Sequence, residues 1–192
     1  MTSLSSCPSC LFIGGVRSGK TALAQKWLER QCSLLLYVAT CKRQDAEMRE
    51  RIARHQAARD QRWLCMESPE NIAEDLENFF CDESIARRGA LIDCLSMWLA
   101  NMLEINAPSN AIFAKLRQLL ISARELSIPI AFVSAECGLG FIPTNKLARR
   151  YGDLLGEINQ ICARYCQSVY FVSCGLALPS SFSGRAKPQE TK

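Results

Sequence analysis

Apolar residues in this chain gather in short continuous runs, and longer stretches of helical spacing separate the runs. The runs at residues 11–13, 33–40, 90–93 and 128–134 are too short for helices. They also lack the alternation of a half-exposed strand, so we expect strands buried on both faces. A further strand is expected at 168–173. Helices are expected at 22–30, 45–59, 69–81, 95–103, 111–126 and 143–166.

The order of these elements predicts the fold class. Strands and helices alternate along the whole chain, which is typical of an α/β protein with a mainly parallel sheet and helices on both faces. A length of 192 residues suits one domain, and no internal repeat is visible. We expect a flexible leader at 1–10, a single domain at 11–178 and a disordered tail at 179–192.

A glycine-rich stretch joins the first expected strand to the first helix, and it fits the pattern G-x-x-x-x-G-K-[ST]. Its residues are Gly14, Gly15, Val16, Arg17, Ser18, Gly19, Lys20 and Thr21. In such a loop the backbone N–H groups and the following helix N-terminus bind phosphate oxygens. Lys20 is expected to contact the outer phosphates and Thr21 to bind Mg²⁺. The stretch predicts a fold of the P-loop NTPase type.

Further candidate residues fall at the carboxyl ends of other expected strands. Ligands of open parallel sheets bind at that edge. Thr40, Asp93 and residues 134–136 all end strands there. An acidic residue at a strand end commonly supports Mg²⁺ in phosphate-loop enzymes, so Asp93 is a candidate second metal ligand.

Charge, hydropathy and cysteine content argue against several other classes of protein. A net charge of +4 is too small to argue for nucleic acid or a membrane surface. No run approaches the roughly 20 apolar residues of a membrane span, and the N-terminus lacks the pattern of a secretory signal. We therefore expect a cytoplasmic protein. Eleven cysteines are scattered, and the odd number argues against a full disulfide framework.

His55 is the only histidine of the chain. In a helix over 45–59 it would share one face with Met48 and Ile52, in a segment rich in arginine. A neutral imidazole can attack a nucleotide's α-phosphate and form a phosphoramidate. The alternative is an ordinary surface or core histidine.

The residues together resemble one enzyme family, the bifunctional adenosylcobinamide kinase/adenosylcobinamide-phosphate guanylyltransferases of cobalamin biosynthesis. The family's G-G-x-R-S-G-K-S appears at 14–21, its Y-[IV]-A-T at 37–40 and its D-x-E-M-x-x-R-I-x-x-H at 45–55. Asn101, Glu136, Gly138, Asn159 and Gln160 match later family positions. The chain departs from the family pattern at Asp60, Ala135 and Gly152.

The resemblance implies a guanylylated nucleophile, a nucleotide site and two reactions. It makes His55 the nucleophile. It adds to the phosphate loop the nucleotide-binding residues Ala39, Thr40, Cys41, Gln56, Ala57, Ala58, Arg59, Glu67 and Asp93. It implies phosphorylation of adenosylcobinamide by ATP or GTP, and then transfer of GMP from GTP to adenosylcobinamide phosphate with release of pyrophosphate. It also implies Mg²⁺ and a homo-oligomer.

Two other functions are compatible with parts of the sequence. The first is a small-metabolite kinase with the same phosphate loop and no covalent step. The second is a GTP-binding switch, which needs a base-reading element such as Asn-Lys-x-Asp. Residues 145–148 read Asn-Lys-Leu-Ala and lack the aspartate.

Overall fold

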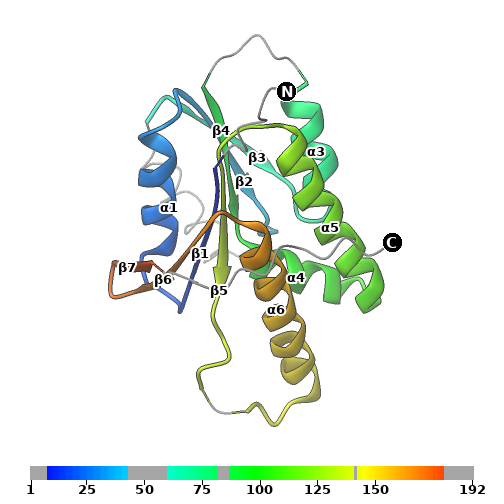
Figure 1. Cartoon of the computed structure of the whole chain (residues 1–192). Coiled ribbons are helices and arrows are strands. Elements are labelled where there is room, and N and C mark those ends of the chain that lie inside the picture. The colour runs from blue at the N-terminus through cyan, green and yellow to red at the C-terminus, as the bar shows by residue number, and fades with distance from the viewer. Residues whose placement is uncertain (1–7, 43–59, 82–86, 141, 180–192) are drawn as a thin grey trace.

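A computed structural model describes residues 8–42, 60–81, 87–140 and 142–179. Seven strands form one sheet in the order β3-β2-β4-β5-β1-β6-β7 (Figure 1). The strands are β1 Ser9–Gly14, β2 Leu34–Ala39, β3 Trp63–Glu67, β4 Arg88–Asp93, β5 Ile130–Ala135, β6 Ser168–Ser173 and β7 Leu176–Pro179. All neighbouring pairs are parallel except β6 and β7, which are antiparallel.

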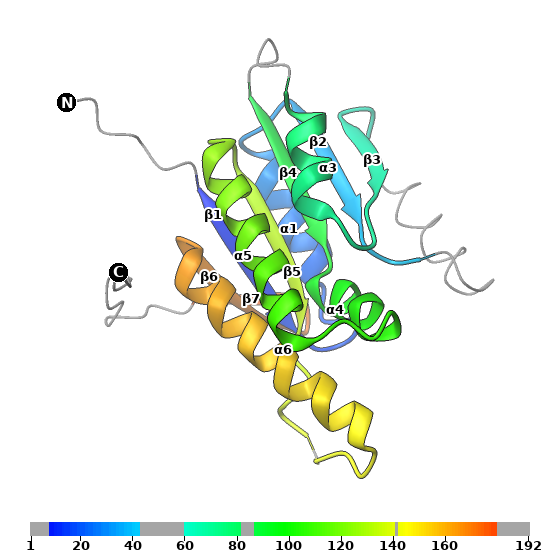
Figure 2. The same ribbon diagram turned by 90° about the vertical axis from the view of Figure 1, so that its right-hand side faces the viewer.

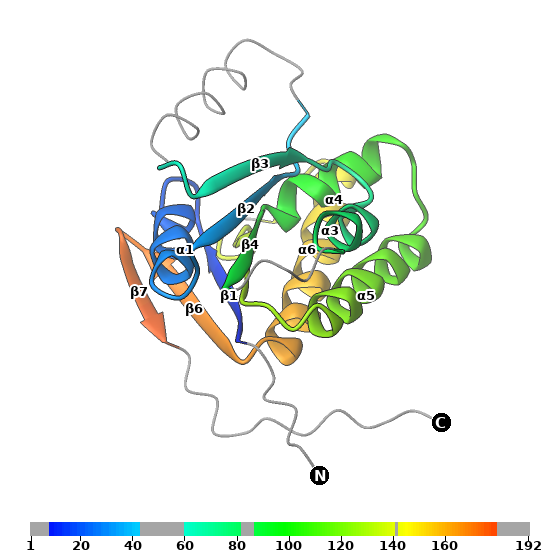
Figure 3. The same cartoon turned by 90° about the horizontal axis from the view of Figure 1, so that it is seen from above.

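Helices cover both faces of the sheet, as the sequence predicts. They are α1 Lys20–Glu29, α3 Ile72–Phe79, α4 Leu95–Glu104, α5 Ser109–Glu125 and α6 Lys146–Tyr165. Figure 3 shows α1 on one side of the sheet and the other four on the opposite side. The fold class is therefore α/β with a mostly parallel sheet, in agreement with the expectation. None of the helices in the described residues is long and apolar enough to cross a membrane.

The sheet separates two apolar cores because successive side chains of a strand point to opposite faces. In β1, Phe12 packs with α1, whereas Leu11 packs with the four helices of the other face. In β4, Leu91 joins the α1 core and Ile92 the other. The central strands are thus buried on both faces, which explains why they are continuous apolar runs in the sequence.

Two strands were not expected from the sequence, and both lie at the edges of the sheet. In β3, only Trp63 is buried, and β7 contains no buried residue. Both strands do contain short apolar stretches, at 63–66 and 176–178, but most of these side chains are not buried. β1 also begins at Ser9, two residues before the expected strand. The helix expected at 45–59 lies outside the described residues.

The segment between β5 and α6, with the first turns of α6, extends beyond the carboxyl edge of the sheet (Figure 2). It exposes three large apolar side chains, Leu139, Ile142 and Leu147. Asn145 caps α6, because its side-chain oxygen accepts hydrogen bonds from the N–H groups of Leu147 and Ala148. The long helix thus has a defined start outside the main body of the fold.

Candidate nucleotide site

The parallel strands bring most of the sequence-predicted residues to one edge of the sheet. Ala39 pairs with both Glu67 and Asp93 in the strand registers, and Gly14 pairs with Ala135. Strands in a sheet are about 4.8 Å apart. Because β3 is four strands from β1, Glu67 lies roughly 19 Å from the phosphate loop. Together these strand ends form an extended edge, with the phosphate loop toward one end and Glu67 at the other.

The phosphate loop connects the end of β1 to the start of α1 over a very short path. Gly19 directly precedes α1 with φ 92°, and Arg17 has φ 57°. The Lys20 Nζ donates a hydrogen bond of 3.0 Å to the Gly15 carbonyl, and Thr21 is the second residue of α1. This arrangement directs the N-terminal N–H groups of α1 and the lysine ammonium toward one place, where an anion is favoured.

Gly14 is held in a position that no larger residue fits. A Cβ atom at Gly14 would lie 2.2 Å from the carbonyl oxygen of Val172, which belongs to the neighbouring strand β6. It would also lie 2.9 Å from Ser18 Oγ. Close packing of backbone on backbone therefore requires glycine where β1 enters the loop.

The turn between β6 and β7 supports the loop from a distant part of the sequence. The Gly175 N–H donates to the Ser18 carbonyl at 2.8 Å. A Cβ atom on Gly19 would lie 3.1 Å from Gly175 Cα. Gly175 itself has φ 77°, which favours glycine. Sequence reasoning missed this contact, and the only local signal is a glycine two residues after the end of a strand.

Ser18 is a further polar group inside the loop. It is 7% exposed, and its hydroxyl has no hydrogen-bond partner within the part of the chain that the structure describes. An unpaired buried hydroxyl costs free energy unless a ligand satisfies it. The loop therefore retains hydrogen-bonding capacity for a polar ligand.

Asp93 ends β4 on the face of the sheet that α1 covers. Its Oδ2 accepts a hydrogen bond of 2.7 Å from Tyr37 Oη. Carboxylate and hydroxyl oxygens are the ligands that Mg²⁺ prefers, so Asp93 and Thr21 are chemically suited to it. Among the described residues no cluster of three or more His, Cys, Asp or Glu could hold a metal ion. Mg²⁺ bound mainly through phosphate and water oxygens requires no such cluster.

Thr40 connects the ends of two strands with all of its polar groups. Its Oγ1 accepts a hydrogen bond from Cys94 N and donates one to Cys94 O, both at 2.8 Å. Its N–H donates to Asp93 O at 3.1 Å, and its carbonyl accepts from Asn101 Nδ2 at 2.7 Å. Asn101 Nδ2 also donates to Pro69 O at 2.9 Å. In this structure Thr40 is fully buried and frames the edge of the site.

Two thiols lie near the lysine of the loop, and both are disfavoured as nucleophiles. Burial, and then the Asp93 carboxylate, raise the pKa of the Cys94 thiol to about 11, although Lys20 opposes the shift. Burial and then Glu136 raise the pKa of Cys137. A thiolate is the reactive form of cysteine. Both side chains are therefore protonated at neutral pH.

The remaining predicted residues divide between described and undescribed parts of the chain. Ala39 is buried and Cys41 is half-buried at the end of β2. His55, Gln56, Ala57, Ala58 and Arg59 lie outside the described residues. The structure therefore gives no position for the expected nucleophile relative to the loop.

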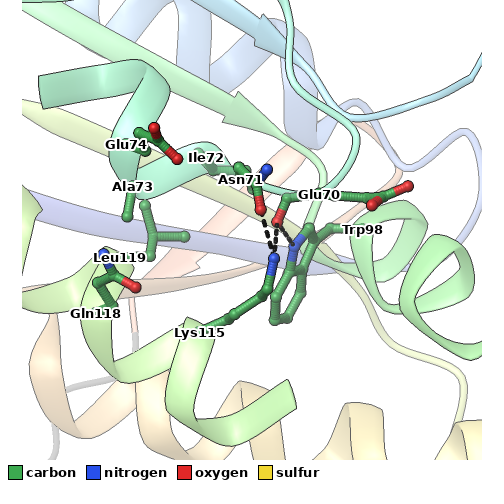
Figure 4. Close-up of a pocket in the computed structure, with 9 residues that line it drawn as sticks. All are labelled: Glu70, Asn71, Ile72, Ala73, Glu74, Trp98, Lys115, Gln118 and Leu119. Atoms are coloured by element: carbon green, nitrogen blue, oxygen red, sulfur yellow. Dashed lines mark hydrogen bonds between the residues drawn. The ribbon is translucent and has the colours of Figure 1, made fainter. Parts of the chain in front are cut away.

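A separate cavity of about 50 Å³ lies between α3, α4 and α5 (Figure 4). Lys115 Nζ donates hydrogen bonds to Glu70 O at 3.5 Å and to Asn71 Oδ1, and Trp98 Nε1 donates to Glu70 O at 3.2 Å. These bonds fasten the start of α3 to the two neighbouring helices. Small-molecule sites usually measure about 300 Å³ or more, so this cavity is too small for a nucleotide.

Comparison with known proteins identifies the family to which the chain is similar. Residues 10–179 match the model of the family described as cobinamide kinase/cobinamide phosphate guanyltransferase. A Pseudomonas aeruginosa relative, named bifunctional adenosylcobalamin biosynthesis protein CobP, is 38% identical over 169 residues, covering 88% of this chain and 95% of the relative. The Escherichia coli relative, named bifunctional adenosylcobalamin biosynthesis protein CobU, is 27% identical over 180 residues, covering 88% and 97%.

A solved structure supports the fold alone. The chain resembles a KaiC-like protein from Pyrococcus horikoshii with a TM-score of 0.54 and 15% identity, over 86% of this chain and 71% of the other. The match of the family model over most of the chain decides the assignment. This chain belongs to the cobinamide kinase/cobinamide phosphate guanyltransferase family.

Proposed function

We propose that this chain performs two successive reactions on a corrinoid. It phosphorylates a hydroxyl of adenosylcobinamide with ATP or GTP, and it then transfers GMP from GTP to the new phosphate, releasing pyrophosphate. The observation that carries the proposal is the loop between β1 and α1, with Lys20 beside the Gly15 carbonyl, in a chain that matches the family over residues 10–179.

In the kinase reaction the corrinoid hydroxyl attacks the γ-phosphorus, and the bond to the bridging oxygen breaks. The backbone N–H groups of the loop and the Lys20 ammonium offset the charge on the phosphate oxygens as it moves. Thr21 and Asp93 would hold Mg²⁺, which neutralises phosphate charge when bound. The partly unsatisfied loop, including the Ser18 hydroxyl, is suited to receive these oxygens.

In the transferase reaction a nitrogen of His55 attacks the α-phosphorus of GTP. A nitrogen–phosphorus bond forms while the bond to pyrophosphate breaks. An oxygen of the corrinoid phosphate then attacks the same phosphorus, and the nitrogen–phosphorus bond breaks. The raised pKa values of Cys94 and Cys137 argue against a thiolate of either residue in this role.

Replacing Lys20 by alanine tests the proposed role of the loop. We expect kcat/KM of adenosylcobinamide phosphorylation to fall by about 10²- to 10³-fold, as for loss of one charge-stabilising donor at a developing charge. The assay follows conversion of adenosylcobinamide to its phosphate and then to the GDP derivative by chromatography. Lys26→Ala is the matched control, because Lys26 is an exposed residue in the last turn of the same helix.

Two outcomes would contradict the proposal. If purified wild-type protein converts neither substrate with any cobinamide acceptor, the proposed activities are wrong. If Lys20→Ala retains the rate of Lys26→Ala, the loop does not bind the reacting phosphates as proposed.

A further inference from the structure

Asp93 is held by a residue of the adjacent strand. Tyr37 lies in β2, and Asp93 ends β4 opposite Ala39. Because side chains two residues apart point to the same face of a sheet, Tyr37 and Asp93 lie on the face that α1 covers. The Tyr37 hydroxyl reaches along this face and donates a hydrogen bond to Asp93 Oδ2 at 2.7 Å.

The tyrosine has little freedom to move. It is 7% exposed, and its ring packs in the core that includes Leu35 and Leu91. The backbone after Asp93 is also fixed, because Thr40 bonds both the N–H and the carbonyl of Cys94. A fixed donor and a fixed backbone together restrict the carboxylate to one orientation.

The two oxygens of Asp93 are thereby made unequal. Oδ2 accepts the phenolic hydrogen bond, whereas Oδ1 is not part of that bond. Carboxylates that bind a metal are usually hydrogen-bonded to a supporting group, and loss of such a group typically weakens metal affinity by about 10- to 100-fold.

We propose that Tyr37 is a positioning residue for the metal–nucleotide complex, which it serves by orienting Asp93 so that Oδ1 faces the metal. This inference rests on the proposed function, in which Asp93 supports Mg²⁺. Tyr37 itself does not contact the reacting atoms. Its contribution is the direction of the carboxylate, and loss of the hydroxyl should therefore weaken metal binding more than nucleotide binding.

The test is Mn²⁺ binding to the full chain in the presence of GTP, measured by electron paramagnetic resonance of the free Mn²⁺. Tyr37→Phe removes one oxygen atom and adds no volume. We expect the dissociation constant of Mn²⁺ to rise by about tenfold. At saturating metal, KM for GTP should return close to the wild-type value, and the kinase reaction should need a higher Mg²⁺ concentration for half-maximal rate.

Tyr170→Phe is the matched control. Tyr170 lies on β6 and packs against the same core, where its ring stacks on Phe12 with centroids 5.2 Å apart. Removing its hydroxyl should leave Mn²⁺ affinity at the wild-type value. Equal weakening in both variants would mean that a general loosening of this core, and not the bond to Asp93, changes the affinity.

Asp93→Asn separates the inference from the function on which it rests. If Asp93→Asn binds Mn²⁺ as tightly as the wild type, the proposed metal role of Asp93 is wrong. If Asp93→Asn binds weakly and Tyr37→Phe binds normally, the role of Asp93 stands and the positioning role of Tyr37 is overturned.

Discussion

Replacing His55 by alanine is expected to abolish covalent labelling of the protein by GTP that carries the label on its α-phosphate. GMP transfer to adenosylcobinamide phosphate should fall by at least about 10³-fold, because the variant lacks the nucleophile that divides one displacement into two. Phosphorylation of adenosylcobinamide should persist, since the phosphate loop is unchanged. The label on the wild type should be lost in acid and kept in alkali, as expected for a nitrogen–phosphorus bond.

The labelled residue can be assigned directly in this experiment, because the chain has one histidine. Label that survives in His55→Ala must lie on another type of residue, and a normal transfer rate in that variant would contradict the covalent mechanism. Adding free imidazole to His55→Ala should restore part of the transfer rate. A wild-type protein that phosphorylates the corrinoid without ever taking up label would instead be a plain kinase.

Replacing Gly14 by alanine should damage both the stability of the fold and the nucleotide site. The added Cβ would meet the Val172 carbonyl at 2.2 Å, and backbone in the adjacent strand cannot move aside without breaking the sheet. Overpacking of this kind costs about 1–3 kcal/mol, which lowers the melting temperature by roughly 2–12 °C for a protein of this size. GTP affinity should fall as well, because the displaced residue begins the loop. Thermal melting and GTP titration measure the two effects.

Gly15→Ala is the matched control for stability. A Cβ atom at Gly15 meets no atom within 4 Å, although the substitution is directly adjacent in the chain. We expect its melting temperature to stay close to that of the wild type. Equal melting temperatures for Gly14→Ala and Gly15→Ala would show that the contact with Val172 does not limit the loop.

Most of the strands that sequence reasoning found are buried on both faces, whereas the two that it missed are largely exposed. β2, β4 and β5 have continuous apolar sequences because both of their faces are covered, and this composition is visible locally. β3 and β7 form at the edges through pairing with β2 and β6. They contain short apolar stretches that sequence reasoning did not take for strands, because the strand conformation there depends on pairing with distant partners.

The candidate site also contains features that local sequence predicts and contacts that it does not predict. The phosphate loop was predictable because its glycines, lysine and hydroxyl residue act at fixed local spacing. The bond from Tyr37 to Asp93 joins residues 56 positions apart, and Gly175 supports Ser18 from the far end of the domain. Only the order of strands in the sheet brings such pairs together. Thr40 was predicted to bind the nucleotide. Its place in the sequence could not show that its polar groups form hydrogen bonds within the protein, to Cys94 and Asn101.

The turn after β6 joins the phosphate loop to the last described strand through the hydrogen bond from Gly175 to Ser18. If bound GTP orders Ser18, we expect the hydrogen bond from Gly175 to strengthen with it, and any such coupling between the two places is reciprocal. Amide hydrogen exchange at Gly175 should therefore slow when GTP binds, and unchanged exchange would argue against the coupling. By the same reciprocity, we expect nucleotide affinity to weaken when the chain is ended before Leu176 or when a bulky protein is fused there.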